Sequence, residues 1–362
     1  MYTVKDFYEE IRSEIPSIKC KNLKNIEICL PNEQLEMIKK LLLMWSNNSM
    51  VNEAEKLLND ILRQPNNQNG KVYEALVYSW LSNHSIRYKP QFHINKEYCF
   101  KKENEGFDSD GIIIEESIVF DIKKFGLTLP HIETLRKKIQ EKISSEYYII
   151  ISGSENISTR EIKVDFLEKI DELVVKIMKE ENKNHTDYIY HDLKHRLEFR
   201  VCEKKPNRLF ISMSEFDLYE WAANNEFYFM YHASQFCFNV PYILFCPFDR
   251  NIAYMFSNND INFIYTTFRA LCRRIFINLL KMESRKINEF DGKAISDISI
   301  STASRKISAI VFMDVSEEYN DNNCRIFVYQ NPNADHKLKR YQVNTMFRNA
   351  GAYIEDFLFD NY

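Results

Sequence analysis

Glycine is scarce in this sequence, which has 7 glycines among 362 residues. A nucleotide-binding loop needs several closely spaced glycines, because only glycine lets the backbone approach a phosphate so tightly. Neither a G-x-G-x-x-G pattern nor a P-loop pattern occurs. The scarcity argues against dinucleotide-dependent redox chemistry and against nucleotide-driven motor chemistry within this chain.

The patterns of zinc sites, secretion signals and membrane spans are also missing. The 8 cysteines form no C-x-x-C pair and show no zinc-ligand spacing. The first residues contain no signal-peptide hydrophobic stretch, and no apolar run reaches the roughly 18 residues of a membrane span. We therefore expect a cytoplasmic protein with reduced thiols and no membrane contact.

Strong positive charge is absent as well, since the formal net charge is −4. A protein that binds nucleic acid would then need local clusters of basic residues for its phosphate contacts. Solvated helix faces are the common alternative explanation of such clusters. The candidates are Arg136–Lys138, Arg269 with Arg273 and Arg274, and Lys337–Arg340.

What the sequence does contain is a pattern of two short strands joined by a tight turn at residues 108–124. Strand-forming residues, mostly isoleucine and valine, lie on either side of Glu115 and Glu116. With these two glutamates as the loop, the register places Asp110 directly opposite Asp121. Their Cβ atoms would lie roughly 5 Å apart.

Two facing carboxylates repel each other unless a cation lies between them, and Mg²⁺ is a cation that prefers oxygen ligands. Lys123 shares a strand face with Asp121, where its ammonium could orient a water molecule or a phosphate. The acid-x-lysine tripeptide is common in this sequence, but here it lies in an apolar, strand-forming run. Charged groups are costly to bury there unless they are paired or metal-bound. An exposed hairpin with a solvated Asp–Lys pair is the alternative.

A further acid lies in a predicted helix at residues 70–81, which follows the turn-rich segment 64–70. This helix would carry apolar side chains on nearly all of its sides, which is typical of a buried helix. Glu74 falls on a stripe of apolar residues, and buried carboxylates are rare without a partner. It could point towards the two aspartates or serve as a capping or helix-dipole group in the first turn.

This order of elements resembles the PD-(D/E)XK nuclease superfamily, which has the restriction-endonuclease-like fold. The resemblance covers roughly residues 67–155, including a predicted strand at 85–94 and a predicted helix at 130–143. It implies metal-binding or catalytic roles for four side chains and one backbone carbonyl. Glu74 would be the helix acid, Asp110 and Asp121 the metal ligands, Lys123 the lysine that positions and activates water, and Ile122 the residue whose carbonyl binds metal.

Two details of the motif depart from the family pattern or leave an alternative open. Ser109 stands where a proline often precedes the first aspartate. Asp108 competes with Asp110 for the metal-binding role, because the two share a strand face.

The expected fold class is α/β, with a restriction-endonuclease-like mixed sheet flanked by helices, a helical N-terminal region and a second α+β domain at the C-terminus. The expected boundaries are 1–66, 67–183 and 184–362. A strand at 147–152, buried on both faces, should belong to the nuclease domain. Helices are also predicted at 34–45, 53–62, 158–177, 260–283 and 341–359, and strands at 241–246, 307–312 and 324–329.

The resemblance implies a Mg²⁺-dependent endonuclease acting on double-stranded DNA, with Mn²⁺ as a substitute ion and restriction or anti-phage defence as its setting. The C-terminal region 184–362 would sense the target, or bind a trigger or partner protein that holds the nuclease inactive, and a homo-oligomer is also possible. An RNA nuclease fits equally, and a non-catalytic nucleic-acid or protein-interaction module on a degenerate nuclease scaffold is the other alternative. His185, His191 and His195 suggest a second metal site only weakly, since the sequence completes no ligand set.

Overall fold

The computed structural model of the chain describes most of its 362 residues. The described residues are 2–21, 23–24, 26–28, 30–63, 70–100, 106–125, 130–153, 162–184, 186–195, 197–203, 218–248, 261–287, 298–315 and 324–357.

The chain folds into two compact units, and one interrupts the other. Residues 1–125 and 229–362 form the first unit, while residues 126–228 form the second. These limits differ from the expected boundaries at 66 and 183. The expected boundary between residues 183 and 184 falls within β5 (Lys183–Asn184), a strand of the second unit.

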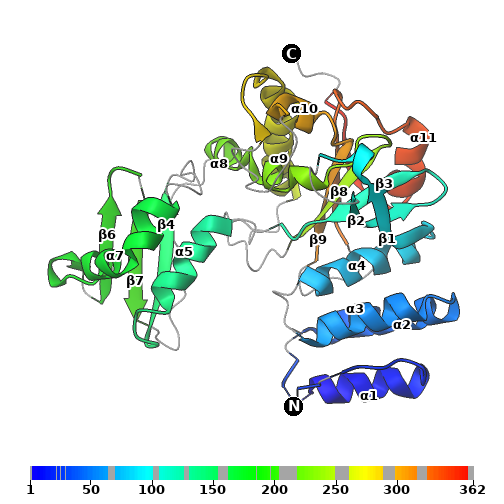
Figure 1. Cartoon of the computed structure of the whole chain (residues 1–362), viewed down its shortest axis with the longest axis horizontal. Helices are drawn as coiled ribbons and strands as arrows, with labels where there is room; N and C mark the ends of the chain where they lie inside the picture. Colours follow the sequence, from blue (N-terminus) through cyan, green and yellow to red (C-terminus); the bar gives the residue numbers. More distant parts are fainter. Residues whose placement is uncertain are drawn as a thin grey trace. The chain divides into compact units, whose positions relative to one another are not determined.

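A seven-stranded mixed sheet is the centre of the first unit (Figure 1). Its strand order is β1-β2-β3-β8-β9-β10-β11. The pairs β1/β2, β2/β3 and β9/β10 are antiparallel, and the pairs β3/β8, β8/β9 and β10/β11 are parallel. The strands are β1 (Tyr88–Asn95), β2 (Gly106–Ile113), β3 (Ile118–Ile122), β8 (Tyr242–Phe248), β9 (Ala309–Asp314), β10 (Ile326–Gln330) and β11 (Tyr353–Glu355).

The hairpin of β2 and β3 has the predicted register, because Ile113 pairs with Ile118 and Gly111 with Phe120. Gly111 is required at its position by close packing. A Cβ atom there would lie 2.5 Å from the Phe120 ring and 2.8 Å from the carbonyl oxygen of Lys89. The glycine thus lets the ring of Phe120 cross over β2 immediately beside Asp110.

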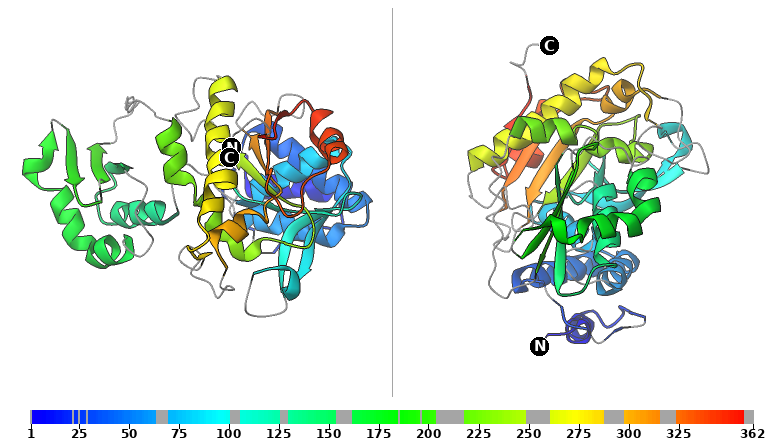
Figure 2. Two further views of the ribbon diagram at one scale, coloured as in Figure 1. Left: turned by 90° about the horizontal axis from the view of Figure 1, so that it is seen from above. Right: turned by 90° about the vertical axis from the view of Figure 1, so that its left-hand side faces the viewer.

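Helices cover both faces of this sheet (Figure 2). On one face, four helices share a continuous core with the side chains of Phe120, Phe245 and Val311. They are α1 (Val4–Glu14), α2 (Asn32–Asn47), α3 (Val51–Arg63) and α4 (Gly70–Asn83), which confirms the helices predicted at 34–45, 53–62 and 70–81. On the other face, α9 (Ile261–Arg273) stacks Phe268 on Phe312 of β9, with ring centroids 3.8 Å apart.

Short helical segments complete the first unit. The predicted helix at 260–283 is confirmed as α9 followed by two helical turns. The one predicted at 341–359 is helical only as far as residue 348, because β11 follows. The short helical segments of the first unit are η1 (Lys96–Tyr98), η5 (Tyr228–Gln235), η7 (Arg274–Asn278), η8 (Leu279–Lys281), α10 (Ile300–Ser304), α11 (Arg340–Val343) and η10 (Asn344–Arg348).

The second unit has its own antiparallel sheet, in the order β4-β7-β6-β5. Its remaining elements are α5 (Pro130–Gln140), β4 (Tyr147–Gly153), η2 (Ile162–Phe166), η3 (Leu167–Lys169), α7 (Ile170–Ile177), η4 (Glu180–Asn182), β6 (Asp187–Asp192), β7 (Leu197–Glu203) and α8 (Leu218–Asn225). The start of the helix predicted at 158–177 lies outside the described residues.

The strand predicted at 147–152 is present as β4, but two expectations about it are wrong. It pairs with β7 in the second unit rather than with the hairpin strands. It is also not buried on both faces, since Ile149 is buried while Ile150 is half-buried and Ser152 is exposed. β4 is the edge strand of a small sheet. The place beside β3 is taken by β8 instead.

Within the described ranges, no helix is both long and apolar enough to cross a lipid bilayer.

Candidate functional site

Asp110 and Asp121 lie side by side on β2 and β3, as the register predicted. The backbone N–H of Asp110 donates to Oδ1 of Asp121 at 3.0 Å. In return, the N–H of Ile122 donates to Oδ2 of Asp110 at 2.6 Å. Each carboxylate therefore binds the backbone of the opposite strand, which fixes the orientation of both acids.

Asp121 is buried, with 2% of its surface exposed, and it accepts a hydrogen bond of 2.5 Å from the hydroxyl of Tyr242. Burial raises the pKa of Asp121 to about 6. The ammonium of Lys123 and the hydroxyl of Tyr242 oppose this rise, while the charge of Asp110 adds to it. Asp121 is thus a desolvated carboxylate whose charge depends on nearby groups.

Glu74 on α4 belongs to the same electrostatic cluster. Its pKa is raised to about 7, mainly by burial and then by the negative charge of Asp110. Lys71, whose Nζ donates to Oε2 of Glu74 at 2.6 Å, and Lys123 both favour the ionised form. Glu74 therefore interacts electrostatically with Asp110 of β2 and with Lys123, which follows β3.

Lys123 directly follows β3, where its N–H donates to the carbonyl of Phe245 at 2.8 Å. Its positive charge lowers the pKa of both Glu74 and Asp121, so the ammonium favours the ionised form of two of the acids. Ile122 lies between the two charged residues, and its side chain packs into the core shared with α1–α4. Each of the four charged side chains named by the sequence motif interacts electrostatically with at least one of the others. We call Glu74, Asp110, Asp121 and Lys123 the acid–lysine cluster.

Asp108, the competitor of Asp110, belongs to a different environment. Its side chain is 68% exposed and pairs with Nδ1 of His93 on β1 at 2.8 Å. Because Asp110 makes the bond to the strand of Asp121, the structure favours Asp110 over Asp108 for the role of first acid.

Three residues around the cluster were not singled out from the sequence. Lys71 stands one helical turn before Glu74, a spacing that could have indicated the ion pair. The hydroxyl of Tyr78, on the same helix, donates to the carbonyl of Asp110 at 2.7 Å. No local pattern could have identified Tyr242, because it lies 121 residues from Asp121 in sequence.

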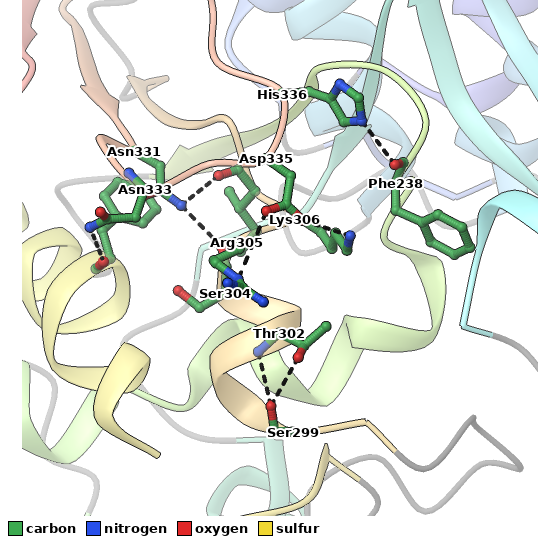
Figure 3. Close-up of polar contacts among 12 residues, drawn as sticks. Phe238, Ser299, Thr302, Ser304, Arg305, Lys306, Asn331, Asn333, Asp335 and His336 are labelled. Atoms are coloured by element: carbon green, nitrogen blue, oxygen red, sulfur yellow. Dashed lines mark hydrogen bonds and ion pairs between the residues drawn. The ribbon is translucent and has the colours of Figure 1, made fainter. Parts of the chain in front are cut away.

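Polar contacts at the start of β8 hold Tyr242 in place. Oγ of Ser308 accepts from the N–H of Tyr242 at 2.9 Å and donates to the carbonyl of His336 at 2.6 Å. The ring Nε2 of His336 lies 3.1 Å from the carbonyl of Phe238, as Figure 3 shows. These contacts connect the loop after β10 to the segment that precedes β8. They thereby fix the position of the Tyr242 backbone, from which the side chain extends to Asp121.

Tyr242→Phe is expected to destabilise the protein by about 1–3 kcal/mol at pH near 8, because the ionised Asp121 loses a buried hydrogen bond. The loss should be smaller at pH near 5, where a carboxyl of pKa about 6 is mostly protonated. Urea unfolding at both pH values measures the difference.

An equal loss at both pH values would contradict a specific interaction with the ionised Asp121. The double variant with Asp121→Asn supplies the control, since the pH-dependent part of the loss should disappear there.

Asp110 and Asp121 supply oxygen donors of the kind that Mg²⁺ prefers. In the part of the chain that the structure describes, no three or more His, Cys, Asp and Glu residues are grouped closely enough to hold a metal. Mg²⁺, however, commonly takes only one or two carboxylates and keeps several waters. The raised pKa values of Glu74 and Asp121 reflect crowded, desolvated negative charge that a cation would relieve.

His191 and His195 of the second unit have acid partners that the sequence did not reveal. The ring of His195 lies between Asp192 and Asp165, with both nitrogen–oxygen distances 3.0 Å. His191 lies 3.7 Å from Glu198. His185 is outside the described residues. No metal-binding group of three is found here among the residues with described positions.

One candidate phosphate contact is already neutralised within the fold. Nε of Arg269 lies 2.6 Å from Oε2 of Glu355, and this contact lowers the pKa of the carboxyl. In the cluster at Arg136–Lys138, Lys138 forms an ion pair with Glu141 at 2.8 Å. Both ion pairs reduce the positive charge that these clusters would offer to nucleic acid.

Comparison with known proteins gave no match to a family model, to a curated protein or to a solved structure. The architecture is α/β with a mixed seven-stranded sheet and a second four-stranded sheet. Its assignment to the restriction-endonuclease-like fold stays a prediction.

Proposed function

We propose that the protein is a Mg²⁺-dependent endonuclease that hydrolyses phosphodiester bonds in DNA. The observation that carries the proposal is the reciprocal pairing of Asp110 and Asp121, with Lys123 among the acids and Glu74 facing them from α4. Facing acids with an adjacent amine suit phosphodiester hydrolysis, because this reaction needs an oriented water and stabilisation of charge on phosphate.

Asp110, Asp121 and the carbonyl of Ile122 would hold the ion, and Glu74 would bind it directly or through a water. Bound Mg²⁺ would lower the pKa of a water ligand and stabilise negative charge on the scissile phosphate. Lys123 would hold the attacking water in line and offset phosphate charge. Tyr242 and Tyr78 would keep the two aspartates in position.

The order of the elements along the chain supports the proposal, in addition to the acid–lysine cluster. The acid helix α4 precedes the meander β1–β2–β3, in which β2 carries Asp110 and β3 carries Asp121. This is the order from which the resemblance to the PD-(D/E)XK superfamily was drawn. A role in restriction or anti-phage defence, and regulation by a partner protein or by self-association, belong to the same proposal.

One observation favours the non-catalytic alternative. Both aspartates already accept hydrogen bonds from backbone amides, and Asp121 accepts another from Tyr242. A fully satisfied pair of this kind can hold two strands together without an ion. On this view the first unit is a scaffold that binds nucleic acid or protein, and Lys123 only balances the charge of the acids.

Incubation of the purified protein with supercoiled plasmid, with Mg²⁺ and with EDTA, separates these functions. The nuclease is expected to nick or linearise the plasmid with Mg²⁺ or Mn²⁺, and EDTA should remove the activity. A parallel digestion of RNA tests the choice of substrate. Cleavage by the protein alone would rule out a partner that is needed for activation.

Failure to cut DNA or RNA, together with no Mn²⁺ binding by calorimetry, would support the non-catalytic scaffold. Mn²⁺ binding without cleavage would indicate a nuclease that requires its partner.

A further inference from the structure

Cys99 and Cys237 lie opposite each other on two segments of the first unit. Cys99 directly follows η1, after the end of β1, and Cys237 lies on the segment that leads to β8. An isolated antiparallel bridge pairs them. The N–H of Phe238 donates to the carbonyl of Tyr98 at 3.1 Å, so the hydrogen bond joins the flanking residues rather than the cysteines themselves.

This pattern identifies the cysteines as a non-hydrogen-bonded antiparallel pair. In such pairs the Cα atoms lie about 4.5 Å apart and the side chains leave on the same side, closer together than in hydrogen-bonded pairs. Disulfides span Cα separations of about 4.4–6.8 Å. The backbone at Cys99 and Cys237 therefore has the spacing of a cross-strand disulfide.

Both sulfurs are thiols in this structure, and each has a separate acceptor. Sγ of Cys237 donates to Oδ1 of Asn239 at 2.9 Å, and Sγ of Cys99 lies 3.7 Å from the carbonyl of Lys96. Burial is the main cause of the raised pKa of Cys237, and the nearby Cys99 and Asp121 add to it. The two thiols are thus close to each other, and Cys237 is close to the acid–lysine cluster.

We propose that Cys99 and Cys237 are a disulfide-forming pair, a reversible modification site beside the acid–lysine cluster. The co-reactant is a small-molecule disulfide, such as oxidised glutathione. The thiolate of Cys99 attacks one of its sulfurs and releases one glutathione. The thiolate of Cys237 then attacks the sulfur of Cys99 in the mixed disulfide and releases the second glutathione.

The exchange is balanced, since two protein thiols are oxidised while one disulfide is reduced to two thiols, which take up the two protons. Cys99 is the first nucleophile because it is 5% exposed, against 1% for Cys237. The bond would join the β1–β2 connection to the start of β8. It would also close a loop that contains the whole second unit, which restricts the unfolded chain.

The test is a thiol map of the full-length protein after incubation with oxidised glutathione. Free thiols are alkylated in denaturant, the protein is digested without reduction, and peptides are identified by mass spectrometry. The expected result is a peptide pair joined through Cys99 and Cys237, and a thermal midpoint raised by roughly 5–10 °C. Dithiothreitol should reverse both.

A matched control uses the thiols that are more exposed. Cys20 and Cys324 are half-buried, so the double variant Cys20→Ser, Cys324→Ser removes them while it leaves the proposed pair intact. This variant should form the same cross-link, whereas Cys99→Ser and Cys237→Ser should form none. The wild-type map alone is decisive, whether or not the serine variants fold.

Recovery of Cys99 and Cys237 as alkylated thiols, or as separate glutathione adducts, from folded and oxidised wild-type protein would overturn the proposal. Neither outcome depends on nuclease activity.

Discussion

Asp121→Asn is expected to lower the rate of DNA cleavage by a factor on the order of 10³ or more, while the protein stays folded. The amide keeps the size of the carboxylate but removes the negative charge that would bind the ion. It can still accept from the N–H of Asp110 and can exchange a hydrogen bond with Tyr242. Plasmid digestion measures the loss of cleavage, and Mn²⁺ calorimetry measures the loss of metal binding.

When no metal is present, Asp121→Asn should maintain or raise the stability of the folded protein, although it removes activity. Burial raises the pKa of Asp121 to about 6 in the folded protein, from its ordinary value of 3.8. A carboxyl with a raised folded pKa favours the folded state at low pH, and this contribution is lost as pH rises from about 4 to about 6. The neutral asparagine escapes that loss, so in EDTA near pH 8 the variant should be at least as stable as the wild type.

Asp108→Asn is the matched control, because it makes the same chemical change at an exposed aspartate on the neighbouring strand β2. It should cut DNA at the wild-type rate. Loss of activity in Asp108→Asn with normal activity in Asp121→Asn would contradict the assignment of Asp121 to the site. Normal cleavage by both would remove the basis of the proposed site.

Lys123→Met should reduce cleavage by about 10²-fold to 10³-fold, since the amine that orients water and offsets phosphate charge is lost. Metal binding should persist or strengthen, because a positive charge next to the acids has been removed. Methionine keeps the apolar stem of lysine, so the packing beside β8 is largely retained. Single-turnover cleavage at saturating Mg²⁺ and Mn²⁺ calorimetry separate the two effects.

The control for this variant is Lys124→Met at the next position. The ammonium of Lys124 lies 4.8 Å from the centre of the Tyr73 ring, and strand alternation directs its side chain away from that of Lys123. A small effect at Lys124 with a large one at Lys123 is the expected result. Equal, modest losses in both variants would indicate general attraction to DNA rather than a role in the chemistry.

The hairpin with its two aspartates was predictable from sequence because all the information is local. A two-glutamate turn, strand-forming residues and the alternation of strand faces fix which residues face each other. The prediction that Asp110 opposes Asp121 is confirmed by the register. Glu74 was predictable in the same way, since a lone acid on an apolar helix stripe needs a partner.

The neighbour of β3 could not be predicted in this way. A parallel pair is joined by a crossover of any length, and the local pattern does not identify the strand that completes it. The apolar run at 147–152 follows the predicted helix after the hairpin and looks like a central strand. The run at 242–248 has the same appearance. It pairs with β3, although the whole second unit lies between the two strands in the sequence. Tyr242 was missed for the same reason.

The interruption of the first unit by the second has a consequence for synthesis of the chain. Asp110, Asp121 and Lys123 leave the ribosome well before β8, which supplies both the Tyr242 hydroxyl and the strand on the far side of β3. An unfinished polypeptide that stops within the second unit holds the acids without these supports. The proposed hydrolytic centre can therefore mature only after translation has passed β8, so prematurely terminated products would lack the complete proposed site.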